Sequence, residues 1–326
     1  MRRIAHSRRL LTVALAAVVA AIGLVVSPAA GDAAARVVGV REISPRISLI
    51  SVYSPAMDRV IDSHVLHPVG KPAGLPSFYM LPGAGGAEDG ISWYNNGGVK
   101  EFFAGKQVNV VLPMGGRFSM MTNWQHSDPM LGVNKWQTFY TRELPDAIDR
   151  TFRTSGANAL SGVSMSAGPA LDLAIQAPDR FRAVAAYSGC PGTTDPLGRL
   201  SNTVIPLRGG ANPFNMWGFY DNPDWIKHDP VVNAGKLRGK TIFLSAGSGL
   251  PGPIDGGPRE TLGGMFGGNV IEAIALSCTS NMSNRLNALG INHRFNHRPD
   301  GTHSWGLFSA DMRLSWPMIA RAIGVR

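Results

Sequence analysis

The stretch SGVSMSAGPA (161–170) places three serines between an apolar run and a segment with helical spacing. A nucleophile elbow is a strand, a sharp turn and a helix, with small residues two positions before and two positions after the nucleophile. Ser161 falls inside the apparent strand and has a β-branched residue two positions after it. Ser164 falls at the turn and has Gly162 and Ser166 at these positions, so we predict Ser164 as the nucleophile.

The motif departs from G-x-S-x-G because Ser166 stands where the last glycine is expected. On the motif alone, an ordinary strand-to-helix turn whose serines cap the helix is an equal alternative. The choice depends on whether a histidine, an acid and two backbone N–H groups can meet Ser164 in space.

Short apolar runs alternate with helical spacing on both sides of this stretch. The runs are SFYML (77–81), VNVVLPM (108–114), NALSGV (158–163), AVAAYSG (183–189) and TIFLSAG (241–247). Such runs are typical of parallel strands that helices cover on both faces. The earlier segments 46–54 and 59–67 alternate apolar and polar residues, which predicts antiparallel strands. Helical spacing runs from Trp136 to Phe152, where Pro145 is predicted to open a second helical segment.

A serine hydroxyl needs a base, and in α/β-hydrolases the base histidine follows the last strand. Among eight histidines, His303 in PDGTHSW follows the last strand-like piece, so we predict His303 as the base. The position of the third catalytic residue, the acid, is less well defined by the sequence. Asp255 follows the run TIFLSAG, with Glu260 and Glu272 further on, and spacing alone favours Asp255.

An oxyanion hole requires backbone N–H groups that point at the developing negative charge. One is expected from Met165, directly after the nucleophile. The other is expected from the glycine-rich segment MLPGAGG (80–86), where Ala84 or Gly85 would donate. A phosphate-binding loop is excluded there because no G-K-[ST] follows.

The first 35 residues have four arginines, an apolar run and then small residues, which predicts a cleavable export signal. The alternative is a single-pass membrane anchor, for which the apolar run is at the short limit of length. Its removal lowers the formal net charge from +9 to +6. No linker or repeat divides residues 36–326, so we expect one domain. No long basic run indicates nucleic acid as a partner, whereas a moderately basic surface suits an anionic cell envelope.

The chain has two cysteines, Cys190 and Cys278. Two thiols of an exported chain commonly pair. A bridge over roughly 90 residues would stabilise the fold by about 4 kcal/mol. The alternative is two buried free thiols. No His/Cys cluster indicates a metal, and no cofactor is expected.

Many ordered segments of the chain resemble the antigen 85 mycolyltransferases of mycolic-acid bacteria, most closely the corynebacterial-type members. The segments are YMLPGAGG, NVVLPMGGRFSMMTNW, KWQTFYTRELP, SGVSMSAG, AAYSGCPGTTDPLG, NMWG, HDPVVNAGKLRG, VIEAIALSC and RPDGTHSWG. They extend over nearly the whole chain after the signal. The resemblance implies a secreted α/β-hydrolase fold, with a mostly parallel central sheet and helices on both faces.

The resemblance also implies roles for single residues. It implies Ser164, Glu272 and His303 as the catalytic residues, so that Glu272 replaces Asp255 as the acid. It further implies Met165 and Ala84 as oxyanion donors, Gly85, Trp124, Ser304 and Trp305 as substrate contacts, and a Cys190–Cys278 disulfide. Pro82 and Gly85 stand where the family has an aspartate and an arginine that hold trehalose. Sugar recognition by this loop is therefore not implied.

The implied activity is transfer of mycolic acid from trehalose monomycolate to a second trehalose monomycolate or to cell-wall arabinogalactan, by a monomer associated with the outer envelope. Apolar residues of segments 212–225 and 263–268 are candidates for an acyl groove, and plain packing is the alternative. The rival functions are a secreted serine carboxylesterase and a non-catalytic envelope-binding relative.

Overall fold

The structure, a computed structural model, describes residues 34–255 and 267–325. Within these residues, nine strands form one sheet in the order β1-β2-β3-β5-β4-β6-β7-β8-β9. The strands are β1 (Arg36–Ser44), β2 (Ile47–Ser54), β3 (Arg59–Leu66), β4 (Ser77–Leu81), β5 (Asn109–Pro113), β6 (Asn158–Val163), β7 (Ala183–Tyr187), β8 (Thr241–Ala246) and β9 (Arg294–His297). Strands β1 to β3 and the β3–β5 pair are antiparallel, and the pairs from β5 to β9 are parallel.

The described helices are α1 (Trp93–Asn96), α2 (Val99–Phe103), α3 (Trp136–Thr138), α4 (Leu144–Phe152), α5 (Ala167–Gln176), α6 (Pro196–Arg208), α7 (Phe214–Trp217), α8 (Asp224–Lys227), α10 (Asn269–Ala288) and α11 (Trp305–Ile323). Four short π- or 3₁₀-helical segments are also described: η1 (Phe139–Glu143), η2 (Ser164–Ser166), η3 (Ala234–Leu237) and η4 (Pro253–Asp255). None of the described helices has the length and apolarity needed to cross a membrane.

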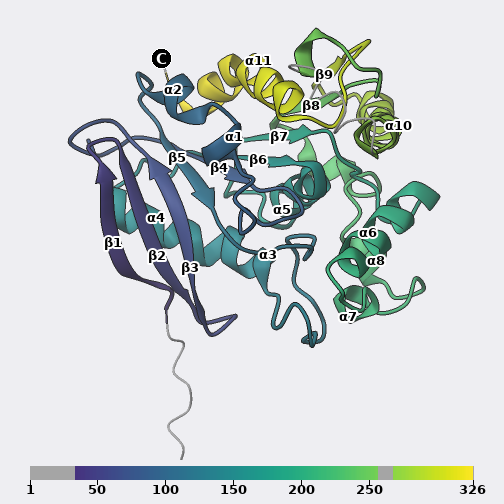
Figure 1. Cartoon of the computed structure of the whole chain (residues 1–326), viewed down its shortest axis with the longest axis horizontal. Helices are drawn as coiled ribbons and strands as arrows, with labels where there is room; N and C mark the ends of the chain where they lie inside the picture. The colour runs from purple at the N-terminus through teal and green to yellow at the C-terminus, as the bar shows by residue number, and fades with distance from the viewer. Residues whose placement is uncertain (1–33, 256–266, 326) are drawn as a thin grey trace, which may run out of the picture. The chain divides into compact units, whose positions relative to one another are not determined.

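Helices cover both faces of the sheet (Figure 1). One core lies between the sheet and α3, α4 and α5, and it includes residues of α10. The other lies between the sheet and α1, α2 and α11. The parallel strands β4 to β7 are buried throughout because both layers cover them. The predicted α/β-hydrolase fold, with a mostly parallel sheet and helices on both faces, is confirmed.

The segment with helical spacing forms three consecutive pieces, α3, η1 and α4. The middle piece is a π-helical turn, and α4 begins at Leu144 with Pro145 in its first turn. A proline is tolerated there because the first N–H groups of a helix have no intrahelical acceptor. The predicted helical restart at Pro145 is confirmed.

Strand β1 is absent from the sequence-based prediction. It pairs with β2 only, and its residues are exposed or half-buried. A strand with no fully buried face lacks the regular alternation that would predict it. The expected export signal, residues 1–35, lies almost wholly outside the described residues and stays a prediction.

Candidate active site

Ser164 lies at the junction between β6 and α5, in a left-handed backbone conformation with φ of 56°. Non-glycine residues rarely adopt this conformation, which points the side chain away from both flanking elements. Two glycines make room for the turn. A Cβ atom on Gly162 would lie 2.0 Å from the Ser166 carbonyl oxygen, and one on Gly189 would lie 2.4 Å from the Ser164 carbonyl oxygen.

The other two serines have structural roles. The Ser166 hydroxyl accepts a hydrogen bond from the Val163 N–H at 2.9 Å and donates to the Val163 carbonyl at 3.1 Å. Ser161 is buried within β6. Of the three serines, only Ser164 lines a described cavity.

His303 lies in the loop between β9 and α11 and connects Ser164 with Glu272. Its Nε2 lies 2.8 Å from Ser164 Oγ, and its Nδ1 lies 2.7 Å from Glu272 Oε2. The backbone N–H of His303 donates to the Gly268 carbonyl at 3.1 Å, which fixes the loop beside the start of α10. With Nδ1–H donated to the carboxylate, Nε2 is free to accept the serine proton.

Glu272 lies in the first turn of α10 and is fully buried. Its Oε1 accepts hydrogen bonds from the Ser188 hydroxyl and from the Gly247 N–H, each at 2.7 Å. A buried carboxylate is costly unless it is hydrogen-bonded, and here both oxygens have partners. Ser188 and Gly247 directly follow β7 and β8, so two strand ends orient the carboxylate.

Asp255, which spacing favoured as the acid, bonds to the two neighbours of His303 and not to its ring. Its Oδ1 accepts from the Thr302 N–H and hydroxyl, each at 2.8 Å, and from the Ser304 hydroxyl at 2.9 Å. Its Oδ2 accepts from the Gly252 N–H at 2.8 Å. Burial alone would raise the pKa of Asp255, but these hydrogen bonds outweigh it and lower the pKa. Asp255 therefore anchors the loop that carries His303.

The two predicted oxyanion donors lie beside Ser164. Met165 and Ala84 both line the cavity that contains Ser164. The loop after β4 approaches closely, since a Cβ atom on Gly83 would lie 3.9 Å from Ser164 Cβ. Within the described residues, neither the Met165 nor the Ala84 N–H has a protein acceptor, so both remain available for a ligand oxygen.

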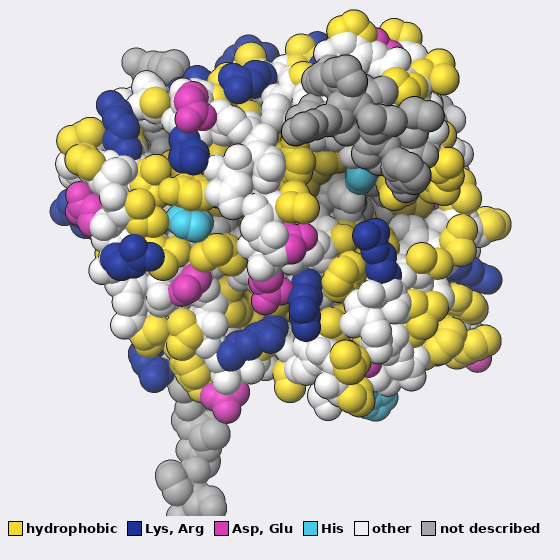
Figure 2. Space-filling model, in the orientation of Figure 1, with side chains coloured by type: hydrophobic (Ala, Val, Ile, Leu, Met, Phe, Trp, Pro, Cys, Tyr) yellow, Lys and Arg dark blue, Asp and Glu magenta, His cyan; other side chains and the backbone are white. Residues whose placement is uncertain are grey.

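The cavity at Ser164 has a volume of about 310 Å³ and is mostly apolar. Helix α6 contributes Leu197, Leu200, Ser201, Val204, Ile205 and Arg208, and α10 contributes Ile271, Ile274 and Ala275. Several of the apolar side chains are exposed, including Leu200, Val204 and Ile271. Figure 2 shows hydrophobic side chains on the side of the molecule where α6, α7 and α10 lie in Figure 1. The cavity can therefore hold a hydrocarbon chain next to Ser164.

A disulfide joins Cys190 and Cys278, with their Cα atoms 4.8 Å apart. It links the loop after β7 to the middle of α10, and Cys190 lines the cavity at Ser164. The Thr279 hydroxyl donates to the Gly189 carbonyl at 3.1 Å beside it. The helix that carries Glu272 is therefore tied to the loop beside Ser164, and the expected disulfide is confirmed.

Four predicted substrate contacts lie outside the set of cavity-lining residues. The prediction that Trp124 contacts substrate is corrected, because Trp124 is buried in the core with 1% of its surface exposed. Its Nε1–H donates to the Ser119 carbonyl. Ser304 is the N-cap of α11 and donates to Asp255. Trp305 packs edge-on against Trp93 with ring centroids 5.2 Å apart. Gly85 is half-buried and adjoins Ala84.

The segments proposed for an acyl groove also lie elsewhere. In 212–225, Met216, Trp217 and Trp225 are buried in the core, and none of the segment lines the cavity. Plain packing is therefore the better description. Most of segment 263–268 lies outside the described residues. Its last residue, Gly268, accepts the hydrogen bond from the His303 N–H.

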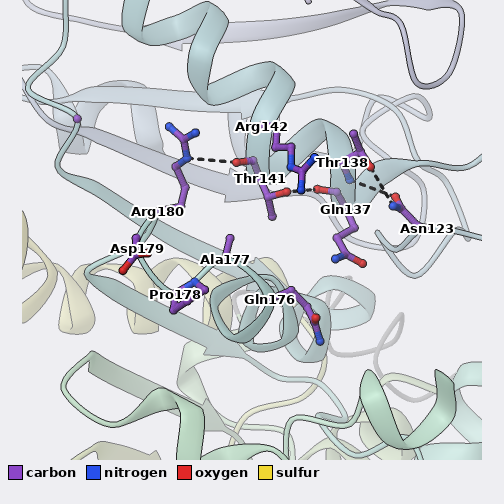
Figure 3. A pocket seen from close by; sticks show the side chains of 11 residues that line it. Asn123, Gln137, Thr138, Thr141, Arg142, Gln176, Ala177, Pro178, Asp179 and Arg180 are labelled. Carbon is purple, nitrogen blue, oxygen red and sulfur yellow. Dashed lines mark hydrogen bonds between the residues drawn. The ribbon is translucent and has the colours of Figure 1, made fainter. Parts of the chain in front are cut away.

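A larger, polar cavity of about 490 Å³ lies at the C-terminal end of α5. Figure 3 shows it between that end, at Gln176, and the segment Gln137–Arg142. Its walls bond to one another: Asn123 pairs with Thr138, and Arg180 donates to the Thr141 carbonyl. None of Ser164, His303 and Glu272 lines it, so the smaller cavity is the candidate active site.

No group of three or more His, Cys, Asp or Glu side chains suited to a metal ion occurs among the described residues. The residue that sequence reasoning missed is Ser188. Ser188 is the serine of the run AVAAYSG (183–189), and the sequence gives no sign that its hydroxyl contacts Glu272, because the two residues are 84 positions apart.

A sequence profile of the family described as Putative esterase matches residues 54–315. The diacylglycerol acyltransferase/mycolyltransferase Ag85A of Mycobacterium tuberculosis (strain ATCC 25618 / H37Rv) is 32% identical over 292 residues, covering 85% of this chain and 82% of that protein. The diacylglycerol acyltransferase/mycolyltransferase Ag85B of Mycolicibacterium smegmatis is 30% identical and covers 85% of this chain and 86% of that protein.

Solved structures support the same fold. The structure of MPT51 (FbpC1) of Mycobacterium tuberculosis superposes with a TM-score of 0.68 at 24% identity, covering 83% of this chain and 96% of that chain. An S-formylglutathione hydrolase from Agrobacterium tumefaciens superposes with a TM-score of 0.63 at 13% identity, covering 89% of this chain and 100% of that chain.

Proposed function

Because the chain belongs to the antigen 85 mycolyltransferase family, a branch of the putative esterases, we propose that it transfers mycolic acid from trehalose monomycolate through a seryl acyl-enzyme. The acceptor is a second trehalose monomycolate or cell-wall arabinogalactan. The observation that carries the proposal is the hydrogen-bonded series Ser164–His303–Glu272 at the wall of an apolar cavity.

In the first half-reaction, His303 Nε2 takes the proton of Ser164 while Ser164 Oγ attacks the ester carbonyl of the donor. The carbonyl oxygen becomes an oxyanion that the Met165 and Ala84 N–H groups stabilise. Glu272 holds the ring and stabilises the imidazolium that forms. The tetrahedral intermediate collapses, His303 returns the proton to the leaving trehalose oxygen, and the mycolyl group remains on Ser164.

In the second half-reaction, His303 takes the proton of an acceptor hydroxyl whose oxygen attacks the acyl-enzyme. Collapse of the second intermediate forms the new ester, and Ser164 recovers its proton from His303. Each donor N–H of an oxyanion hole contributes roughly 3 kcal/mol in comparable enzymes. The two backbone N–H groups therefore contribute to the rate alongside the side chains.

Transfer requires that an acceptor hydroxyl react faster than water. The apolar walls of α6 and α10 hold the acyl chain and leave little polar surface for water near it. An acceptor held against the acyl-enzyme gains a large rate advantage over a diffusing molecule. The cavity thus favours a long-chain acyl transferase.

We further propose export and action in the outer envelope. The first 35 residues have the pattern of an export signal, and the disulfide suits an oxidising compartment. The remaining positive charge favours an anionic surface. We expect a monomer that needs no cofactor.

The test is incubation of the mature protein with trehalose monomycolate, followed by mass spectrometry of the protein and its products. Trehalose dimycolate and a mycolyl adduct on Ser164, both lost in Ser164→Ala, are expected. Free mycolic acid as the sole product would instead identify the esterase that the family profile also allows. Absence of a Ser164-dependent adduct with a fluorophosphonate probe would identify a non-catalytic binding protein.

A further inference from the structure

The cavity at Ser164 contains one guanidinium that an acyl chain cannot use. Arg208 is the last residue of α6 and lines the cavity, while most of the other lining residues are apolar. Among the described residues, Arg208 has neither an ion-pair partner nor a hydrogen-bond acceptor for its side chain, which is exposed. Its donors are available to a ligand.

Arg208 belongs to the end of α6 that lies beside the proposed oxyanion hole. A Cβ atom on the next residue, Gly209, would lie 2.6 Å from Phe118 Cβ, and the Phe118 N–H donates to the Ala84 carbonyl at 2.8 Å. The other end of α6 lies near Gly192, beyond the disulfide. The end of α6 that carries Arg208 is therefore the end nearer to the proposed oxyanion hole.

Asp89 provides a carboxylate next to the same loop. Its side chain lies over Gly85, where an added Cβ atom would be 1.9 Å from Asp89 Oδ2. Oδ1 accepts from the Ile91 N–H at 3.0 Å, and Oδ2 has no protein donor among the described residues. Gly85 directly follows Ala84, so this acceptor is also close to the proposed oxyanion hole.

The loop that carries Ala84 offers no polar side chain, since residues 82–86 read PGAGG. The polar headgroup of an ester, which lies next to the reacting carbonyl, must therefore form its hydrogen bonds with side chains of neighbouring elements. We infer that Arg208 and Asp89 form a subsite for the polyhydroxyl headgroup of the ester substrate. This inference rests on the proposed function and names the residues that recognise the sugar side of the substrate.

The chemistry of the pair fits a neutral polyol. A guanidinium donates to hydroxyl oxygens, and a carboxylate accepts from hydroxyl hydrogens, so together they bind groups that both donate and accept. One positive and one negative charge sum to zero, which disfavours a phosphorylated or strongly anionic headgroup. Loss of one such charged hydrogen bond reduces kcat/KM by about ten- to a hundredfold.

The test compares two esters with the same acyl chain, trehalose 6-octanoate and p-nitrophenyl octanoate. Arg208→Ala and Asp89→Asn are each expected to lower the ratio of kcat/KM for the trehalose ester to that for the p-nitrophenyl ester by about ten- to a hundredfold. Arg208→Lys should recover part of the ratio. Arg199→Ala is the matched control, because Arg199 lies on α6 and stacks on Tyr220 outside the cavity.

An unchanged ratio in both variants would overturn the inference, and so would an equal loss on both esters, which indicates a structural role. Inhibition of p-nitrophenyl octanoate turnover by free trehalose tests the subsite separately. Weaker inhibition in Arg208→Ala supports the subsite even if the wild type forms no trehalose dimycolate. Absence of both trehalose dimycolate and a mycolyl adduct on Ser164 in the wild type would contradict the proposed function but not the subsite.

Discussion

The Ser188 hydroxyl donates a hydrogen bond to Glu272 Oε1 across 2.7 Å. The other oxygen of this buried carboxylate faces His303. Ser188 itself has a positive φ of 51°, directly after β7. A strained backbone position thus supports the group that orients the proposed base.

Ser188→Ala should lower kcat by about tenfold, because one oxygen of a buried carboxylate loses its donor. Ser188→Gly should lower kcat by a similar factor. Because glycine adopts a positive φ more readily than alanine, the midpoint of unfolding of Ser188→Gly should exceed that of Ser188→Ala. Steady-state kinetics and denaturant unfolding of both variants check this. Full activity in Ser188→Gly would show that the hydroxyl does not matter.

Glu272→Gln should keep the fold and lower kcat by about 10³- to 10⁴-fold, because an amide cannot stabilise the imidazolium and can favour the wrong tautomer. The rate with p-nitrophenyl octanoate measures the loss. Glu101→Gln, at an exposed position of α2, is the control. An activity close to wild type in Glu272→Gln would remove Glu272 from the mechanism.

The Cys190–Cys278 bridge closes a loop of 88 residues. Its loss should reduce the free energy of unfolding by about 2–5 kcal/mol, because the unfolded chain gains freedom. Guanidinium unfolding of the wild type, with and without reductant, and of the Cys190→Ser/Cys278→Ser variant measures the change. The reduced wild type and the double variant should agree, and an added effect of reductant on the variant would contradict this account.

The pKa of Asp255 lies below its ordinary value in the folded state, so the unfolded chain binds its proton more readily. The resulting stabilisation is present above about pH 4 and is lost as the pH falls through the folded pKa. Unfolding free energies between pH 2 and pH 6 should fall steeply toward acid in the wild type and less steeply in Asp255→Asn. Identical slopes would refute this assignment.

Ile274→Trp should narrow the cavity between α6 and α10 and shift acyl preference to shorter chains. Rates with p-nitrophenyl esters of increasing chain length should fall for the long esters and remain for the short ones. Ile226→Trp, at an exposed position of α8 outside the cavity, is the control. A uniform loss for all chain lengths would indicate general damage to the fold.

The sequence predicts most of the sheet because the buried strands are solid apolar runs between glycine- or proline-containing turns. Strand β1 escapes prediction because its pairing with β2 leaves no face fully buried. Ser164 and His303 can be predicted from their places after strands. Glu272 cannot be chosen by spacing, because Asp255 is an acid closer to the end of β8, and only the structure shows which of the two bonds to His303. Trp124 lies within a segment that resembles the antigen 85 family, but its side chain is buried in the core.

Ser164 and His303 are 139 residues apart, and β9 must align with β8 before the loop that carries His303 can reach the serine. A chain that ends between residues 164 and 303 has the proposed nucleophile without the proposed base. The proposed catalytic residues can therefore meet only in a chain that is almost complete. We expect fragments that end before His303 to lack esterase activity, because Ser164 would have no base.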